Sequence, residues 1–478
     1  MSLDKDYLAL VEEIEERFPV DAWRAGDVAI WPLARLDLYL DLYWQRHGDR
    51  GGKGPGKMAR TAELLARPLA NPWRQRRDLS RLLLRARQAD VILLGDGVSA
   101  EKIDGAWEDR YGEPVLALLE SEGQSCFQMQ AGDMRRAPWR RPTFPANLVE
   151  AAGQALAPLF QTPLDLPDHA PLMHLLNRLG VQAPSLSPAR LARRAAVLRA
   201  TAWLFERILD TVQPRLAFAV TWYAGLGPAF LLACRRQGIL SVDLQHCPQR
   251  NGHKAYRWSR LPEGGFALLP AVFWTWDDAE AAHIRAWASG PWHRALPGGH
   301  LRRDPFLSTP QLPGEDGIER EILVALQTLQ GREPLWNDLA DTIERAPPGW
   351  RWWIRRHPAA RPEDDARFGR LLFLRGDNIV MDGASAQPLP ALLGRMSAVL
   401  SVSSGVGPEA APVGVPAQAL GDDPRSLIAQ IAALPRHPER PALERLPDPD
   451  FALSLLSGLA ADYARLCAER PAGPRRKR

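Results

Sequence analysis

The sequence predicts an α/β protein of two Rossmann-like domains, each built on a parallel β-sheet. The chain has 478 residues and is 46% hydrophobic, which is enough for two domains of ordinary size. Short apolar runs alternate with helical segments in both halves, as strands and crossover helices do. These runs are apolar almost throughout, as strands covered on both faces require.

The first half contains the strands of one sheet. Strands are expected at 90–94, 215–221, 239–244 and 271–276. The first ends in the turn GDG at 95–97. The second and third enclose a helix at 228–237 that Gly238 stops, and a crossover of that length suits parallel strands.

The second half repeats the pattern beyond a linker expected at 308–320. Strands are expected at 321–326, 350–356, 379–381 and 398–402, and helices at 336–345 and 389–395. The last strand breaks at 403–405 and leads into a helix. We therefore expect an N-terminal domain at 1–312, which includes a helical and aromatic first segment, a C-terminal domain at 313–468 and a basic tail at 469–478.

The excess of basic over acidic residues lies in that tail. The net charge is +4, but five basic residues lie among the last nine: Arg470, Arg475, Arg476, Lys477 and Arg478. Without these five, 55 basic residues face 56 acidic ones, so the body is close to neutral. A nucleic-acid partner is not expected, because such proteins usually carry a basic face on a folded domain. The tail is either a solvated end or a contact to anionic lipid of the inner membrane.

Cysteines and targeting signals favour a cytoplasmic protein. The four cysteines lie far apart without a CxxC motif, which fits a reducing compartment. The first residues form an acidic amphipathic segment rather than a signal peptide. No run of 18 apolar residues occurs, so no membrane-spanning helix is expected.

Ligands of open parallel sheets bind at the carboxyl ends of the strands. That rule selects four loops, at 95–97, 245–253, 355–358 and 403–409.

The loop at 403–409 predicts a phosphate site. Ser403 and Ser404 stand where a strand turns into a helix, and Gly405 lets a ligand approach the backbone. Free N–H groups, the helix dipole and the hydroxyls favour a phosphate there. Glu409 lies one turn on and could reach ribose hydroxyls. The alternative is plain N-capping by Ser404 with close helix–strand packing.

The other loops carry candidate catalytic residues. His357 could donate to a leaving phosphate, and His246 or Asp96 could take a proton from a hydroxyl. His253 and Tyr256 could line the acceptor side. The alternatives are hydrogen-bonded loop histidines and an aspartate in an Asx turn beside Gly97. No metal is assigned, because the histidines lack a third ligand at suitable spacing.

Several of these segments together resemble GT-B-type glycosyltransferases of bacterial surface polysaccharides, a group that includes capsule and lipopolysaccharide transferases, sialyltransferases and CDP-glycerol transferases. The resemblance is carried by QHCPQ (245–249) with His253 and Tyr256, by PGGH (297–300), and by His357-Pro358. It is also carried by SSGVGPEAAPVGVP (403–416) and IWPLARLDLY (30–39). It implies two Rossmann-like domains facing a central cleft.

The resemblance also implies roles for individual residues. His357, Ser403 and Ser404 would hold the donor phosphate and assist its departure. Asp96 would be the general base, although GDG has one acid where the sialyltransferase branch has two. Cys247 stands in place of the glycine of the family's Q-H-G stretch.

The expected activity is a metal-independent transfer from a nucleotide-activated sugar to a glycan or lipid-linked acceptor, with no other cofactor. Domain closure would exclude water from the donor. Three alternatives are a CDP-polyol phosphotransferase, a nucleotide-sugar epimerase, and a non-catalytic scaffold in polysaccharide assembly.

Overall fold

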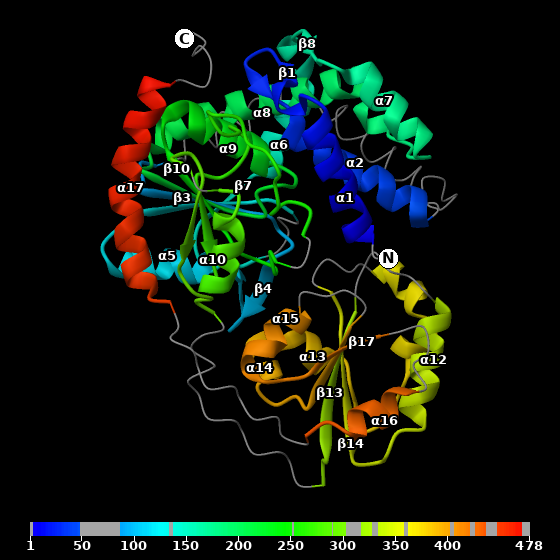
Figure 1. Cartoon of the computed structure of the whole chain (residues 1–478). Coiled ribbons are helices and arrows are strands. Elements are labelled where there is room, and N and C mark those ends of the chain that lie inside the picture. Colours follow the sequence, from blue (N-terminus) through cyan, green and yellow to red (C-terminus); the bar gives the residue numbers. More distant parts are fainter. Residues whose placement is uncertain are drawn as a thin grey trace. The chain divides into compact units, whose positions relative to one another are not determined.

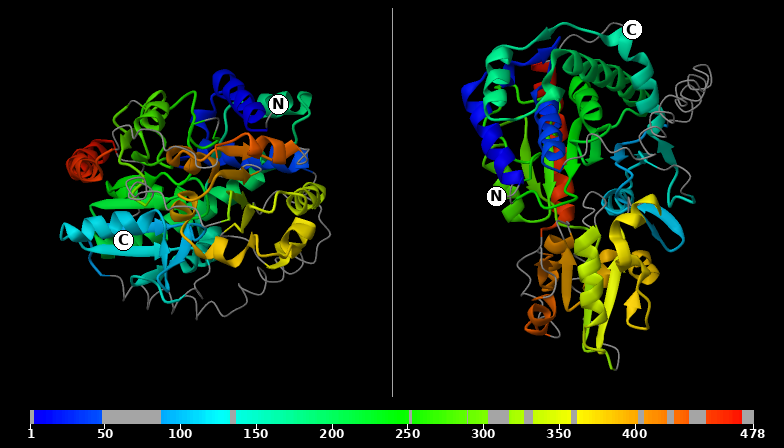
Figure 2. Two further views of the ribbon diagram at one scale, coloured as in Figure 1. Left: turned by 90° about the horizontal axis from the view of Figure 1, so that it is seen from below. Right: turned by 90° about the vertical axis from the view of Figure 1, so that its right-hand side faces the viewer.

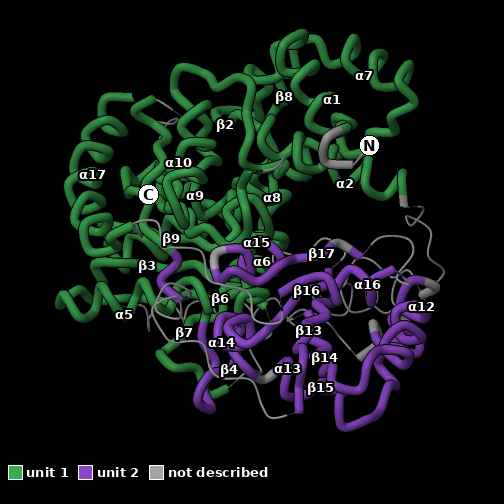
Figure 3. Tube along the Cα trace, turned by 60° about the horizontal axis from the view of Figure 1, so that its bottom comes forward, with its two compact units in different colours: residues 1–99, 109–299, 447–478 green, residues 100–108, 300–446 purple. Residues whose placement is uncertain are grey.

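The computed structural model describes residues 3–47, 87–132, 137–250, 253–288, 290–302, 317–326, 333–357, 362–401, 406–420, 426–435 and 447–470. The chain forms two compact units, coloured separately in Figure 3. Unit 1 comprises residues 1–99, 109–299 and 447–478, and unit 2 comprises residues 100–108 and 300–446.

Unit 1 contains a seven-stranded parallel sheet in the order β12-β11-β10-β9-β3-β6-β7. Figure 1 labels β3, β7 and β10 of this sheet. Its strands are β3 (Val91–Gly95), β6 (Cys126–Gln130), β7 (Thr143–Pro145), β9 (Leu216–Val220), β10 (Leu240–Leu244), β11 (Val272–Thr275) and β12 (Arg294–Pro297). All neighbours pair in parallel. The first strand, β3, lies between the second, β6, and the fourth, β9, which is the doubly wound order of a Rossmann sheet.

Among the described residues, the helices of unit 1 are α1 (Leu3–Arg17), α2 (Trp31–His47), α5 (Gly112–Ser121), α6 (Asn147–Leu156), α7 (His169–Arg178), α8 (Pro188–Val212), α9 (Gly227–Gln237), α10 (Asp278–Arg285) and α17 (Pro449–Glu469). Short 3₁₀ turns are η1 (Val20–Ala22), η2 (Ala157–Phe160) and η3 (Pro184–Leu186). A small antiparallel sheet joins β1 (Arg24–Ala25), β2 (Val28–Ala29) and β8 (Leu164–Asp165). Gly238 ends α9 with a φ of +70°, as the sequence predicts.

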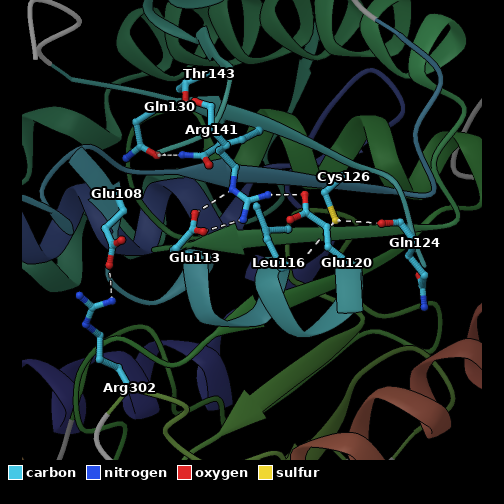
Figure 4. A network of polar contacts seen from close by, with 11 residues as sticks. Glu108, Glu113, Leu116, Glu120, Gln124, Cys126, Gln130, Arg141, Thr143 and Arg302 are labelled. Atoms are coloured by element: carbon cyan, nitrogen blue, oxygen red, sulfur yellow. Dashed lines mark hydrogen bonds and ion pairs between the residues drawn. The ribbon is translucent and has the colours of Figure 1, made fainter. Parts of the chain in front are cut away.

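An arginine ties the segment before β7 to α5, as Figure 4 shows. Arg141 donates to both carboxylate oxygens of Glu113, at 2.7 and 2.6 Å, and to Glu120 at 2.5 Å. Such a forked contact fixes geometry as well as charge.

Unit 2 contains a five-stranded parallel sheet in the order β15-β14-β13-β16-β17. Its strands are β13 (Arg320–Ala325), β14 (Trp350–Arg355), β15 (Ile379–Val380), β16 (Ala398–Ser401) and β17 (Ala417–Ala419). Its helices are α12 (Glu333–Glu344), the 3₁₀ segment η4 (Pro362–Phe373), α13 (Asp382–Ala386), α14 (Leu389–Leu393), α15 (Val406–Ala410), the 3₁₀ turn η5 (Ala411–Val413) and α16 (Leu427–Ala432). In chain order the strands again read 3-2-1-4-5 across the sheet.

Both faces of the unit 2 sheet are covered, which explains its apolar strands. Ile322 and Val324 of β13 belong to one buried cluster with Trp336, while Leu323 between them belongs to another with Leu392. Successive side chains of a strand point to opposite faces, so each face needs its own apolar partners. The predicted fold class, α/β with two Rossmann-like domains, is confirmed.

A hairpin from the first half of the chain belongs to unit 2. It consists of β4 (Ala100–Ile103) and β5 (Ala106–Asp109). Arg302 makes an ion pair with Glu101 at 2.9 Å. It makes a second one with Glu108, which Figure 4 shows. These contacts attach the hairpin to the start of the second half of the chain.

The domain boundaries differ from those expected. The chain leaves unit 1 after Gly299 rather than at 312, and α17 returns to unit 1 instead of completing the second domain. The return has a physical reason: Tyr463 of α17 is buried, and the Arg235 guanidinium of α9 lies 3.3 Å from its hydroxyl. Most of the expected linker at 308–320 lies outside the described residues.

Candidate functional site

The candidate site of unit 1 lies at the switch point of its sheet. The crossovers from β3 and from β9 run in opposite directions, so the loops after these neighbouring strands separate at their carboxyl ends. Asp96 directly follows β3 and Thr221 directly follows β9. The Thr221 hydroxyl donates to Asp96 Oδ2 at 2.7 Å and so links the two loops.

Backbone groups fix the other oxygen of Asp96. Oδ1 accepts N–H bonds from Val98 at 2.9 Å and Ser99 at 2.8 Å, which is the Asx turn expected as the alternative. The turn and a role in chemistry are compatible, since the side chain stays partly exposed. The glycines on either side are required for space. A Cβ at Gly95 would lie 2.0 Å from Gln130 Oε1, and Gly97 has a φ of +78°.

A second carboxyl group, Asp109, lies near Asp96. It is fully buried, accepts N–H bonds from Tyr111 at 3.1 Å and Gly112 at 2.9 Å, and receives Gln130 Nε2 at 3.3 Å. Burial and the neighbouring Asp96 charge raise the pKa of Asp109 to about 6. The sequence shows Asp109 after Asp96 but does not show that the hairpin brings it back to the same place.

Two of the predicted histidines meet at one hydroxyl. Tyr223 OH lies 3.2 Å from His246 Nε2 and 3.4 Å from His253 Nε2. His253 Nδ1 accepts the Ala255 N–H at 3.2 Å, so its proton is assigned to Nε2, which donates to the Tyr223 oxygen. Tyr223 can then donate to His246 Nε2, which assigns the proton of His246 to Nδ1. Sequence reasoning missed Tyr223, which holds both rings.

Both histidines are kept neutral near pH 7. Burial lowers the pKa of His246, although the Asp96 charge acts in the opposite direction. Burial and the nearby Lys254 charge lower the pKa of His253 well below its usual value. The Lys254 ammonium lies over the Tyr39 ring, 4.4 Å from its centre, in a cation–π contact.

Tyr256 does not line the acceptor side, which corrects its predicted role. Its side chain is fully buried, and its hydroxyl donates to Asp243 Oδ2 at 2.8 Å. Asp243 Oδ1 accepts the Trp222 N–H at 3.2 Å. Burial raises the pKa of Asp243 to about 8. Tyr256 therefore makes a buried structural contact with Asp243 and does not face a ligand.

Cys247 does not provide a nucleophile in this state. Its Sγ lies 3.5 Å from His246 Nε2, but burial raises the pKa of the thiol to about 12. A protonated thiol is neither a good nucleophile nor a metal ligand.

Arg35 of the WPLAR segment helps to hold the loop that carries His253. Arg35 and Glu15 are both 2% exposed and lie 3.5 Å apart. Arg35 donates to the Arg257 carbonyl, and Glu15 Oε2 accepts the Ser259 N–H at 3.0 Å. The Arg35 guanidinium also lies 4.1 Å from the centre of the Trp258 ring. Helices α1 and α2 therefore hold the loop on both sides of Trp258.

Tryptophans near these loops belong to the core. Trp222, Trp258, Trp274 and Trp276 are at most 5% exposed. Packing, rather than contact with a ligand, accounts for them.

In unit 2 the switch point lies between β13 and β16. His357 follows β14 and is partly exposed, and Glu409 lies in α15 and is 4% exposed. Ser403, Ser404 and Gly405 lie outside the described residues. Strand β16 ends at Ser401 and α15 begins at Val406, so a strand and a helix lie on either side of the predicted turn. The phosphate site itself stays a prediction.

Within the described ranges, no group of three or more His, Cys, Asp and Glu side chains could hold a metal ion.

Comparisons with known proteins give a distant likeness only. No protein-family model and no curated protein matches the chain. A UDP-GlcNAc 2-epimerase from Neisseria meningitidis, solved with UDP-GlcNAc, is 14% identical, with a TM-score of 0.40 over 71% of this chain and 85% of that one. The UDP-GlcNAc 2-epimerase from Methanocaldococcus jannaschii is 10% identical, with a TM-score of 0.42 over 78% and 99%. The calicheamicin glycosyltransferase is 14% identical, with a TM-score of 0.38 over 79% and 94%. A likeness of this size assigns neither an activity nor a residue role to this chain.

Proposed function

We propose that the protein transfers a sugar from a nucleotide-activated donor to a hydroxyl group of a glycan or lipid-linked acceptor, without a metal. One observation carries the proposal: a partly exposed carboxylate, Asp96, stands at the switch point of unit 1 beside histidines that stay neutral. A carboxylate in that place can remove a proton from a bound hydroxyl.

Asp96 is a better candidate for the base than His246. Tyr223 occupies Nε2 of His246, and the hydrogen-bond order leaves the proton on Nδ1. A neutral His246 also adds no positive charge beside Asp96. His246 is then a positioning residue on the acceptor side.

The acceptor oxygen forms a bond to the anomeric carbon of the donor, and its proton goes to Asp96. The bond from that carbon to the phosphate oxygen breaks, and its electron pair leaves with the nucleotide. We assign the leaving phosphate to His357, Ser403 and Ser404 of unit 2, with Glu409 toward the ribose. Each well-placed donor stabilises such a transition state by about 3 kcal/mol.

The first experiment is a thermal-shift screen with CMP, CDP, UDP, GDP and their sugars. A nucleotide that binds the folded protein raises its melting temperature. The nucleotide that stabilises identifies the donor class, and its sugar is then tested for turnover with and without acceptor glycans. An isomerised sugar formed without acceptor would indicate an epimerase instead, and turnover of a CDP-alcohol alone would indicate a phosphotransferase.

Variants test the residue roles. Asp96→Asn, His357→Ala and Ser404→Ala should lose about a hundredfold or more of the transfer rate while the chain stays folded. Asp104→Asn is the matched control, because Asp104 is an exposed aspartate in the turn of the β4–β5 hairpin. Turnover like that of the unaltered protein in Asp96→Asn would refute the proposed base. If none of the nucleotides raises the melting temperature, the alternative of a non-catalytic scaffold in polysaccharide assembly is favoured.

A further inference from the structure

The β4–β5 hairpin extends directly from the candidate site of unit 1. Strand β4 begins shortly after Asp96, and β5 ends at Asp109. The strands are joined by Asp104 and Gly105, whose φ of +49° and +83° are typical of a two-residue hairpin turn. The hairpin is marked by the β4 label in Figure 1 and belongs to the light-blue part of the ribbon in Figure 2. Its two ends therefore lie at the site of unit 1, while the hairpin itself belongs to unit 2.

The backbone pairing of the hairpin continues into the turn that holds Asp96. The Ser99 carbonyl accepts the Arg110 N–H at 3.0 Å, which extends the antiparallel pairing of the two strands. The N–H of the same Ser99 donates to Asp96 Oδ1 at 2.8 Å. Ser99 thus bonds to the hairpin through its carbonyl and to Asp96 through its N–H. A change in the orientation of the hairpin therefore moves the Asp96 carboxylate.

The other strand leads to the loop of His246. Tyr111 follows β5, and its hydroxyl donates to the His246 carbonyl at 2.8 Å. The Tyr111 N–H donates to Asp109 Oδ1 at 3.1 Å, which fixes the backbone where β5 ends. Both strands of the hairpin therefore end on the candidate site, one at Asp96 and the other at the loop of His246.

One arginine of unit 2 holds both strands of the hairpin. Glu101 of β4 and Glu108 of β5 lie opposite each other, because a two-residue turn pairs the residues at equal distances from it. Arg302 makes an ion pair with each of them. The Arg302 side chain is 14% exposed and that of Glu108 is 3% exposed, so water screens these pairs little. Without Arg302, two largely buried carboxylates would face each other.

Arg302 lies where the chain passes into unit 2. Gly299 is the last residue of unit 1 before this crossing. Its N–H donates to the Thr275 carbonyl at 3.2 Å, and its own carbonyl accepts the Trp274 indole N–H at 2.9 Å. Arg302 is the third residue beyond this fixed point. An ion pair so close to the crossing makes the hairpin follow the first residues of unit 2.

We propose that Arg302 is a positioning residue for Asp96 and acts through the β4–β5 hairpin. Arg302 holds the two strands, the strand pairing continues to Ser99, and the Ser99 N–H holds the Asp96 carboxylate. The orientation of this carboxylate in unit 1 is then set from unit 2. The consequence for transfer rests on the proposed function, whereas the coupling itself is measured without donor or acceptor.

Amide hydrogen exchange of the full chain, resolved to single residues, tests the coupling. Arg302→Met with Glu101→Gln and Glu108→Gln removes the ion pairs without leaving buried charges, so the hairpin can still fold. We expect the Val98 and Ser99 amides, which both donate to Asp96, to exchange about tenfold faster or more in this triple variant. The amides of β9 and β10 should exchange as in the unaltered chain.

Two further variants serve as controls. Lys102→Gln removes a charge from the same strand, but Lys102 is exposed and its side chain points to the face opposite that of its neighbour Glu101. Its Val98 and Ser99 amides should exchange as in the unaltered chain. Arg302→Lys keeps a positive charge between the two carboxylates and should slow the exchange relative to the triple variant.

The outcomes separate this inference from the proposed function. Unchanged exchange of Val98 and Ser99 in the triple variant, equal acceleration in Lys102→Gln, or equal acceleration throughout β9 and β10 would each overturn the coupling, whatever the protein catalyses. Where a donor is turned over, the triple variant should lower kcat about tenfold or more at an unchanged KM for the donor, since Asp96 acts on the acceptor hydroxyl. An unchanged kcat would overturn the positioning role of Arg302. Absence of turnover in the unaltered chain would refute the proposed function alone.

Discussion

Asp243→Asn tests how the buried carboxyl group below the site affects stability. Burial raises the pKa of Asp243 from its usual 3.8 to about 8 in the folded chain. Between these two values the folded state holds a proton that the unfolded state has lost. The contribution of Asp243 to the free energy of unfolding is therefore fully present below about pH 4 and is lost as the pH rises through about 8. The loss is about 1.4 kcal/mol per pH unit, or about 4 kcal/mol from about pH 5 to about pH 8.

Asparagine removes this titration and keeps both contacts, with donor and acceptor exchanged in the one to Tyr256. Its carbonyl can accept the Trp222 N–H, and its amide can donate to the Tyr256 oxygen. We expect the variant to become more stable relative to the unaltered chain as the pH rises. Urea unfolding of the full chain at several pH values, with hydrogen exchange of the β9 and β10 amides to isolate unit 1, measures the difference. Other titrating groups are common to both proteins and cancel. A difference that does not change with pH would refute the reasoning.

Two further predictions concern the groups that hold the site. Tyr223→Phe removes the hydroxyl shared by His246 and His253, so unit 1 should lose about 2 kcal/mol. Nitrogen NMR should then show mixed tautomers of His246, while His253 keeps the tautomer that the Ala255 N–H fixes; an unchanged tautomer of His246 would contradict the assigned hydrogen bonds. Arg35→Met leaves the Glu15 carboxylate buried without its partner charge and should cost about 3–5 kcal/mol of stability in urea unfolding, part of which Arg35→Met with Glu15→Gln should restore. A loss below about 1 kcal/mol in the single variant would show that the pair does not hold the loop.

The predictions from sequence were most accurate where a property is local. Runs such as 215–221 and 350–356 have the apolar composition of strands covered on both faces, and they form β9 and β14. The rule that ligands bind at the carboxyl ends of strands selected the loops with Asp96, His246 and His253, and the structure brings these three together in unit 1. Strand β6 was missed because Gln128 and Gln130 interrupt its apolar pattern, although both side chains are buried.

Long-range packing decided the rest, because contacts between distant segments leave no local pattern. The sequence places α17 in the second domain, and only its buried contact with Arg235 shows that it belongs to unit 1. In the sequence Tyr223 is one more aromatic residue after a strand, and only the structure shows that His246 and His253 both contact its hydroxyl. The sequence predicted that Tyr256 contacts the acceptor, but in the structure its buried hydroxyl donates to Asp243. The sequence by itself determined the strands and the residues at their ends, while the tertiary structure decided which of those residues face one another and which are buried beneath.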